Sequence, residues 1–145
     1  MTDDAARVRA RAEALWAEDP ASRGLGMRLD DVSAGRARLS LPVTASMANG
    51  HGICHGGFIF TLADSAMAFA CNQHGEAVVA QHAAISFLRP GRVGEVLVAE
   101  AVERVRLGPS GIYDVRVCTE GGEVVAEFRG HTRVMRSGGP ARQAG

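Results

Sequence analysis

A single carboxylate stands in the most apolar segment of the chain. The stretch ANGHGICHGGFIFTLADSAMAFACNQHG, residues 48–75, contains Asp64, and a His-Gly-Gly sequence lies two helical turns before it. A carboxylate among apolar neighbours costs free energy unless it is paired or hydrogen-bonded. The hydroxyls of Thr61 or Ser65 are structural partners that would satisfy it. Because function commonly explains a violated local rule, we take Asp64 as the candidate catalytic group.

The glycine pair Gly56-Gly57 supplies a second chemical feature. Glycine at a helix start lets another molecule approach the backbone, and the free N–H groups there favour an oxygen that carries negative charge. Such a helix start is suited to an oxyanion hole for an acyl carbonyl. The alternative is an ordinary flexible helix start.

The spacing of the two features has a consequence for assembly. Gly57 and Asp64 are seven residues apart, which is roughly 10.5 Å along a helix at about 1.5 Å per residue. An oxyanion donor and a nucleophile or base must each lie about 3 Å from the reacting groups. If both groups are catalytic, antiparallel helices of two protomers must bring Gly57 of one near Asp64 of the other. We therefore expect a dimer with two symmetric sites at its interface.

Other chemistries have weaker support. The sequence HGICH offers His51, Cys54 and His55, but zinc usually needs three or four ligands and the next thiol, Cys71, lies far into the helix. Thiol–imidazole catalysis is one alternative, and a histidine bound to the loop backbone beside a buried thiol is another. There is no G-x-S-x-G, P-loop or G-x-G-x-x-G sequence. We expect neither a metal nor another cofactor.

The surrounding segments predict an α+β domain. Asp3 and Asp4 suit the first turn of a helix at residues 2–18, Pro20 follows its end, and the apolar segment 57–74 is too long for a strand and predicts the central helix. Two strands forming a hairpin are expected before that helix, and an antiparallel meander of four strands after it. These strands are expected at residues 27–32, 36–41, 77–88, 95–107, 111–119 and 123–135. One domain over residues 1–136 results, with its first helix within 1–20 and a disordered tail at 137–145.

Composition narrows the class of protein. The chain has 145 residues with 16 basic and 16 acidic side chains, so no net field draws it to nucleic acid or to an anionic membrane. No apolar run is long enough to span a bilayer, and the N-terminus lacks the apolar segment of a secretory signal. Three cysteines without framework spacing favour free thiols in a reducing compartment. We expect a soluble, cytoplasmic protein.

The segment NGHGICHGGFIFTLADSAMAFACN resembles the signature of the hotdog-fold acyl-CoA thioesterases, in particular those that hydrolyse phenylacetyl-CoA in bacterial phenylacetate degradation. The likeness continues through ISFLRPGRVGE, GIYDVRV and VAEFRG, and covers about residues 25–136. The resemblance implies a curved antiparallel sheet wrapped around one long helix, here with an extra N-terminal helix. It also implies protomers that pair sheet to sheet and then form homotetramers.

The resemblance also implies catalytic roles. Asp64 matches the acid that attacks the thioester or activates water, and Gly57 matches the backbone donor to the thioester carbonyl. Asn49 matches the loop asparagine that positions water or substrate. His55 matches the histidine before the glycine pair, with a supporting role around the carbonyl or the thiolate.

Substrate-binding residues follow from the same likeness and from the chemistry of coenzyme A. Gly56 lies beside the carbonyl site, and Phe58 is a candidate for the acyl pocket. The phosphates of coenzyme A need cations or free N–H groups, for which we name Arg89 and the GPSG loop with Ser110 and Gly111.

Three functions remain open at this point. The first is an acyl-CoA thioesterase for phenylacetyl, hydroxylated phenylacetyl or similar aryl and medium acyl groups. The second is a non-catalytic acyl-CoA-binding or regulatory domain, which is disfavoured because Asp64 is present and no DNA-binding segment is attached. The third is a hydratase or dehydratase on the same fold, whose His/acid arrangement we do not find.

Overall fold

The computed structural model describes residues 2–135 of the chain. The predicted tail at 137–145 and the first and last residues of the predicted domain lie outside this range. None of the helices within it is long and apolar enough to cross a membrane.

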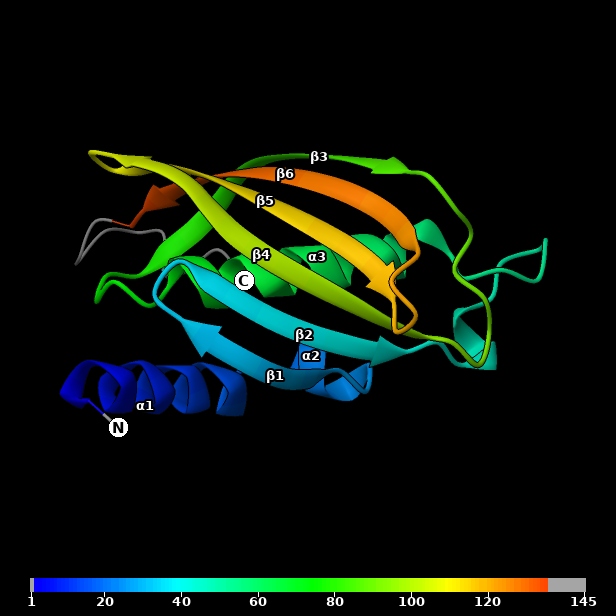
Figure 1. Ribbon diagram of the computed structural model, residues 1–145, viewed down its shortest axis with the longest axis horizontal. Helices are drawn as coiled ribbons and strands as arrows, with labels where there is room; N and C mark the ends of the chain where they lie inside the picture. Colours follow the sequence, from blue (N-terminus) through cyan, green and yellow to red (C-terminus); the bar gives the residue numbers. More distant parts are fainter. Residues whose placement is uncertain (1, 136–145) are drawn as a thin grey trace.

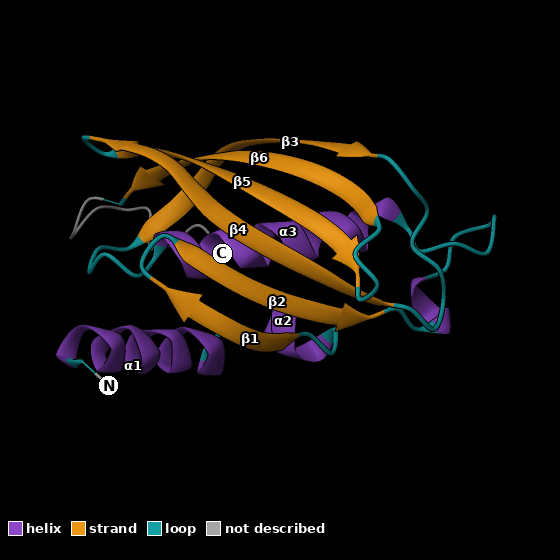
Figure 2. Cartoon of the chain, viewed as in Figure 1, coloured by secondary structure: helices purple, strands orange, loops and turns teal. Residues whose placement is uncertain are grey.

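One sheet of six antiparallel strands curves around one long helix (Figures 1 and 2). The strand order is β1-β2-β4-β5-β6-β3, so β1 and β3 are the two edges. Helix α3 lies against the concave face, while α1 lies beside β1 and α2 follows α1 (Figure 1). The elements in chain order are α1 (Asp3–Ala17), α2 (Pro20–Gly24), β1 (Arg28–Ser33), β2 (Arg36–Pro42), a 3₁₀ helix (Ala45–Met47), α3 (Gly56–Cys71), β3 (Val78–Phe87), β4 (Val96–Leu107), β5 (Ser110–Thr119) and β6 (Val124–Val134).

The ends of both long helices follow from capping side chains. The Thr2 hydroxyl accepts the N–H of Ala5 at 3.1 Å and begins α1 one residue later than predicted. Helix α3 ends three residues earlier than predicted, because the Asn72 side chain bonds both the N–H and the C=O of Val78. These two bonds turn the chain from α3 directly into β3. The short helix α2 and the 3₁₀ helix were not predicted.

The predicted meander of four strands is wrong in one pairing. Strand β3 pairs with β6, and β4 pairs with β2, so only β4, β5 and β6 form a meander. The reason lies in the segment that connects β3 with β4. Its backbone bonds Val125 of β6 through Leu88 and Arg89, and then Val43 beyond β2 through Gly94 and Glu95. The connection therefore carries the chain from one edge of the sheet to its middle, which hydrophobic alternation alone does not reveal.

Small residues let α3 lie close to the sheet. Ala63, Ala66 and Ala70 are fully buried. In β6, a side chain on Gly130 would collide with the sulfur of Met67, so a larger residue there requires the Met67 side chain to move. The buried core comprises the inward residues of the central strands and one face of α3.

The contact of Gly130 with Met67 provides a test of this packing. We expect Gly130→Ala to lower the free energy of unfolding by roughly 1–3 kcal/mol, because the added methyl group overpacks a filled site. Combining it with Met67→Ala is expected to cost less than the sum of the two single changes. Urea unfolding measures both. Gly24→Ala is the control, since its methyl group meets nothing within 4 Å. Additive effects at Gly130 and Met67 would contradict the contact.

Candidate active site

The His-Gly-Gly sequence forms the N-terminus of α3. His55 is the N-cap, and its Nδ1 accepts the N–H of Gly57 at 3.4 Å, a distance longer than an ordinary hydrogen bond of this type. Among residues 2–135 we find no acceptor for the N–H of Gly56. His55 and Gly57 are exposed. The helix start thus offers one unoccupied N–H and one weakly occupied N–H to a carbonyl oxygen.

The two glycines differ in the space around them. A methyl group on Gly56 would stand 2.9 Å from the ring of Phe87, whereas one on Gly57 would meet no atom of the chain closer than 3.8 Å. The packing of the protomer therefore explains the glycine at position 56 and leaves the glycine at position 57 unexplained. Open space at an exposed helix N-terminus is what the approach of a ligand or a partner chain requires.

Asn49 organises the loop before this helix. Its Oδ1 accepts the N–H of His51 at 2.9 Å and of Ile53 at 3.3 Å, and its C=O accepts the N–H of Gly52. Gly52 has a φ of 76°, which a glycine adopts without strain. The Asn49 side chain is half-buried, and its oxygen is already used within the loop. Only its NH₂ group is left to face a substrate or water.

Asp64 stands in the middle of α3 without a polar partner. The Thr61 hydroxyl donates to the C=O of Gly57 at 2.9 Å, and the Ser65 hydroxyl lies 2.8 Å from that of Ser22. Both hydroxyls that would satisfy Asp64 are thus used elsewhere, and residues 2–135 offer it no hydrogen bond or ion pair. Burial first, and the charge of Asp19 second, raise the pKa of the Asp64 carboxyl.

The neighbours of Asp64 along the helix give its direction. Phe60 packs against Phe128 of β6 with ring centroids 5.4 Å apart, and Met67 reaches Gly130 of the same strand. Residues at i−4 and i+3 share a helix face with residue i. The half-buried Asp64 therefore faces the side of the sheet formed by β6 and its open neighbour β3.

A cavity of about 420 Å³ lies beside the start of α3 and includes three of the sequence-predicted residues, Asn49, Gly56 and Arg89. Asp64 is not among the residues that line it. Phe58 stands next to this region, half-buried and edge-on to the His55 ring. One protomer thus brings the helix start, the loop asparagine and Arg89 together, and leaves Asp64 apart.

Arg89 is held by carboxylates. Its guanidinium donates two hydrogen bonds to Glu95, at 3.0 and 2.9 Å, and one to Glu123 at 3.0 Å. Glu95 also accepts the N–H of Arg92, and the Arg89 guanidinium holds the pKa of Glu95 below its usual range. These bonds tie the segment between β3 and β4 to the β5–β6 turn. Its predicted contact with coenzyme A stays a prediction.

Ser110 and Gly111 lie at the other end of α3, where the β4–β5 hairpin meets the last turn of the helix. Gly111 has a packing role, because a methyl group there would stand 2.7 Å from the Thr132 hydroxyl. Ser110 is exposed at the start of β5. Within one chain, the two predicted subsites for coenzyme A are therefore separated by the length of α3.

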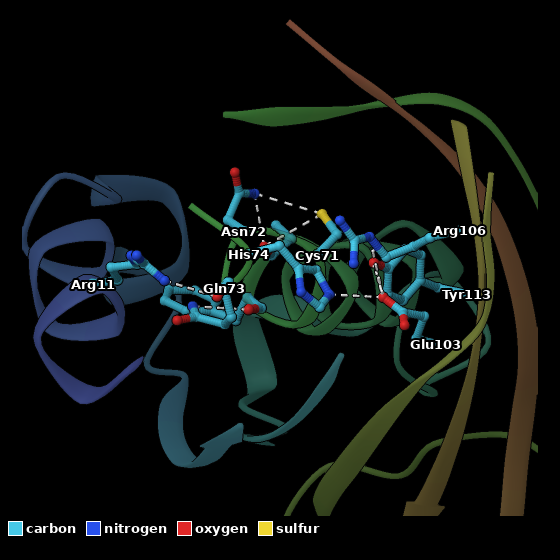
Figure 3. Close-up of polar contacts among 10 residues, drawn as sticks. Arg11, Cys71, Asn72, Gln73, His74, Glu103, Arg106 and Tyr113 are labelled. Atoms are coloured by element: carbon cyan, nitrogen blue, oxygen red, sulfur yellow. Dashed lines mark hydrogen bonds and ion pairs between the residues drawn. The ribbon is translucent and has the colours of Figure 1, made fainter. Parts of the chain in front are cut away.

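The same end of the helix is fixed by a polar cluster (Figure 3). Glu103 Oε1 lies 2.8 Å from His74 Nε2 and accepts the Tyr113 hydroxyl at 2.8 Å. Burial, followed by the hydrogen bond to Glu103, raises the pKa of Tyr113, and burial raises the pKa of Cys71 to about 12. This cluster was not predicted, because its members are distant in sequence and meet only through the β-sheet.

The cysteine beside the helix start is not arranged for catalysis. Cys54 is buried, and its thiol donates to the backbone C=O of His55 rather than to an imidazole. Burial raises its pKa, which reduces the thiolate that a nucleophile needs. Among the described residues, no group of three His, Cys, Asp or Glu side chains is placed to hold a metal ion.

Comparison with known proteins identifies the family. Residues 51–126 match the family model described as the thioesterase superfamily. The chain is 42% identical over 119 residues to the acyl-coenzyme A thioesterase PaaI of Escherichia coli, covering 82% of this chain and 85% of that protein. The chain belongs to the thioesterase superfamily. It is a thioester hydrolase.

Solved structures of relatives show the same fold. The E. coli PaaI protein from the phenylacetic acid degradation operon superposes with a TM-score of 0.89 at 38% identity, covering 91% of this chain and 96% of that one. A mutant of the phenylacetic acid degradation protein PaaI from Thermus thermophilus superposes with a TM-score of 0.78 at 35% identity, covering 81% of this chain and 100% of that one. The predicted α+β hotdog fold is confirmed for this thioesterase.

The position of Cys54 leads to a prediction for the enzyme. We expect Cys54→Ala to retain thioester hydrolysis within about threefold of wild type, because a buried thiol bonded to a backbone carbonyl is not an activated nucleophile. Release of free thiol from a thioester substrate measures the rate. Treatment of the native wild-type enzyme with iodoacetamide should likewise leave its activity intact. A hundredfold loss in the variant, at an unchanged melting temperature, would assign the thiol a catalytic role.

Proposed function

We propose that this thioesterase hydrolyses acyl-CoA esters in the cytoplasm, with phenylacetyl-CoA or a hydroxylated phenylacetyl-CoA as its substrate. The similarity to PaaI proteins supports this substrate class. The observation that carries the catalytic assignment is the carboxylate of Asp64, which is half-buried, faces the open side of the sheet and has no partner among residues 2–135. Acyl-CoA binding without hydrolysis gives no reason for such a carboxylate.

The helix start of one protomer and the Asp64 carboxylate of the other share the reaction. The N–H groups of Gly56 and Gly57 polarise the thioester carbonyl and stabilise the oxyanion that forms. Gly57 exchanges its long bond to His55 for this oxygen. Asp64 then attacks the carbonyl carbon, or removes a proton from the water that attacks it, and the C–S bond breaks to release the thiolate. Addition of one water yields the free acid and coenzyme A.

The raised pKa of Asp64 suits this role. A more basic carboxylate is a better proton acceptor and a better nucleophile than an ordinary aspartate. It must be ionised to act, so kcat/KM is expected to fall as pH decreases through its pKa.

The partner that completes the site is a second copy of the chain, joined along β3. This edge strand of ten residues carries unpaired backbone groups, and Val79, Phe87 and the adjacent Leu88 are exposed by 47%, 51% and 62%. Such an edge invites pairing with another strand. Because Asp64 faces this side, an antiparallel two-fold pairing brings it toward Gly57 of the other copy. Two such dimers form the proposed homotetramer.

The same antiparallel pairing of two copies brings the remaining predicted substrate-binding residues together. Gly56, Asn49 and Arg89 surround the cavity at the start of α3. The hairpin with Ser110 and Gly111 lies at the opposite end of the helix, and antiparallel pairing brings that end of one copy toward the start of the other. Phe58 stands beside the glycine pair, where it contacts the acyl group.

Asp64→Asn tests the catalytic assignment. We expect the release of free thiol from phenylacetyl-CoA to fall at least about 100-fold, because the amide is neither a base nor a nucleophile. The exposed Asp31→Asn is the matched control and should keep wild-type activity. Substantial hydrolysis by Asp64→Asn would contradict the mechanism. A panel of acyl-CoA esters with the wild-type enzyme tests the aryl-acetyl preference separately.

Protein stability provides the folding control for this variant. A carboxylate whose pKa is raised in the folded state destabilises that state once pH exceeds its pKa in the unfolded chain. Asp64→Asn should therefore melt at a higher temperature than wild type at pH 7. The difference should disappear as pH falls through the ordinary range of aspartate. Loss of activity together with a gain in stability excludes misfolding as the cause.

Mixing two inactive variants tests the shared site. In a heterodimer of Asp64→Asn with Gly57→Val, one site combines the intact Gly57 of the first chain with the intact Asp64 of the second, and the other site has neither. Random exchange makes half of the dimers mixed, so about a quarter of wild-type activity should return. Native mass spectrometry verifies the exchange. No recovery in exchanged samples would mean that each chain builds its site alone.

A further inference from the structure

A buried chain of hydroxyl groups connects α2 with the residue that follows Asp64. The Ser22 hydroxyl donates to Asp19 Oδ2 at 2.6 Å, and the Ser22 and Ser65 hydroxyl oxygens are 2.8 Å apart. Ser22 is 1% exposed and Ser65 is 8% exposed. Buried polar groups of this kind cost free energy unless each is hydrogen-bonded, so the folded protein depends on every bond in this chain.

Counting the hydrogens fixes the direction of these bonds. A carboxylate can only accept, so Ser22 must give its single hydrogen to Asp19. Ser65 must then donate its own hydrogen to the Ser22 oxygen. As a result, the hydroxyl beside Asp64 on α3 points toward α2 and is committed there.

Asp19 also brings a second negative charge to this region. It is the N-cap of α2, where its Oδ1 accepts the N–H of Ser22 at 3.0 Å, and it is half-buried. We find no ion pair to it among residues 2–135. Its charge adds to burial in raising the pKa of Asp64.

The other titratable groups that lie along α3 in the described part of the chain have partners or environments of their own. On α3 itself, the Cys71 thiol is neutral at working pH because its pKa is about 12. His74, Glu103 of β4, Tyr113 of β5 and Arg106 form the cluster at the far end of α3 (Figure 3). Arg23 of α2 is exposed and donates to the C=O of Ala17. The charge of Asp19 is the one that adds to burial in raising the pKa of Asp64.

We propose that Asp19 is a positioning residue for the thioesterase reaction: through Ser22 it holds the Ser65 hydroxyl toward α2, and it brings a negative charge to the turn of α3 that carries Asp64. The inference rests on the proposed role of Asp64. Asp19 does not touch the substrate. It acts through the ionisation of Asp64, so its removal changes the pH dependence of the reaction as well as its rate.

Asp19→Asn removes the charge and keeps an oxygen that caps α2 and accepts from Ser22. We expect the acid limb of the profile of kcat/KM against pH to move to lower pH, because a like charge no longer opposes ionisation of Asp64. One pH unit below the wild-type midpoint, the fraction of maximal activity should rise about two- to threefold. At pH 8, kcat should fall by at most about two- to fourfold with KM for phenylacetyl-CoA unchanged, because the base is weaker.

Three further variants make the result decisive. Asp19→Ser retains a capping hydroxyl without charge and should shift the limb in the same direction. Glu120→Gln removes an exposed charge in the β5–β6 turn and should leave the limb unmoved. An unmoved limb in both Asp19 variants, with Asp64→Asn inactive, would overturn the inference and leave the proposed function intact. Activity in Asp64→Asn would instead overturn the proposed function.

Discussion

The contact between α3 and the concave face of the sheet is the constraint on which the rest of the structure depends. Where Met67 meets β6, the strand has glycine, and the buried face of the helix includes the small residues Ala63, Ala66 and Ala70. A close contact of this kind leaves the helix little freedom to rotate or slide, because a packed interior deforms poorly. It therefore fixes both the position of the His-Gly-Gly turn along the sheet and the direction of the Asp64 side chain. Catalytic groups carried on such an element keep their geometry without help from mobile loops.

The polar groups of α3 divide into those that are satisfied within the chain and one that is not. Thr61, Ser65 and Asn72 all donate to groups of the same protomer, and His74 pairs with Glu103. The contacts of Asn72 and His74 join the end of the helix to β3 and β4. The Ser65 contact joins α3 to α2, and the Thr61 bond lies within the helix. Asp64 keeps an unpaired carboxylate within the described residues, although Thr61 and Ser65 of the same helix and Asn72 at its C-cap have partners. A structural role for Asp64 would have used one of them, so the absence of a partner among residues 2–135 favours chemistry over architecture.

Much of this arrangement follows from the sequence, and the parts that do not follow have physical reasons. The helix at residues 56–71 and the alternation in β5 and β6 are local properties, which apolar periodicity reveals. The partner of β3 is not local. Its apolar residues suit either neighbour, and the choice is made by backbone bonds in the segment after it, from Leu88 to Val125. The bond between Ser22 and Ser65 also joins residues far apart in sequence, and neither serine has a distinctive context.

The distance between the two proposed catalytic features depends on both local and long-range structure. Seven residues of regular helix fix the separation of Gly57 and Asp64, and α3 runs without interruption from Gly56 to Cys71. No rotamer of Asp64 spans that separation, and the surrounding sheet prevents a bend that would shorten it. The helix start opens to a cavity beside the segment after β3, while Asp64 faces the side of β6 and β3. Both openings lie toward the sheet edge that has no partner within the described part of the chain. In the proposed dimer, a second copy placed there covers the exposed apolar side chains of β3 and completes both proposed sites, so one pairing would serve both stability and catalysis.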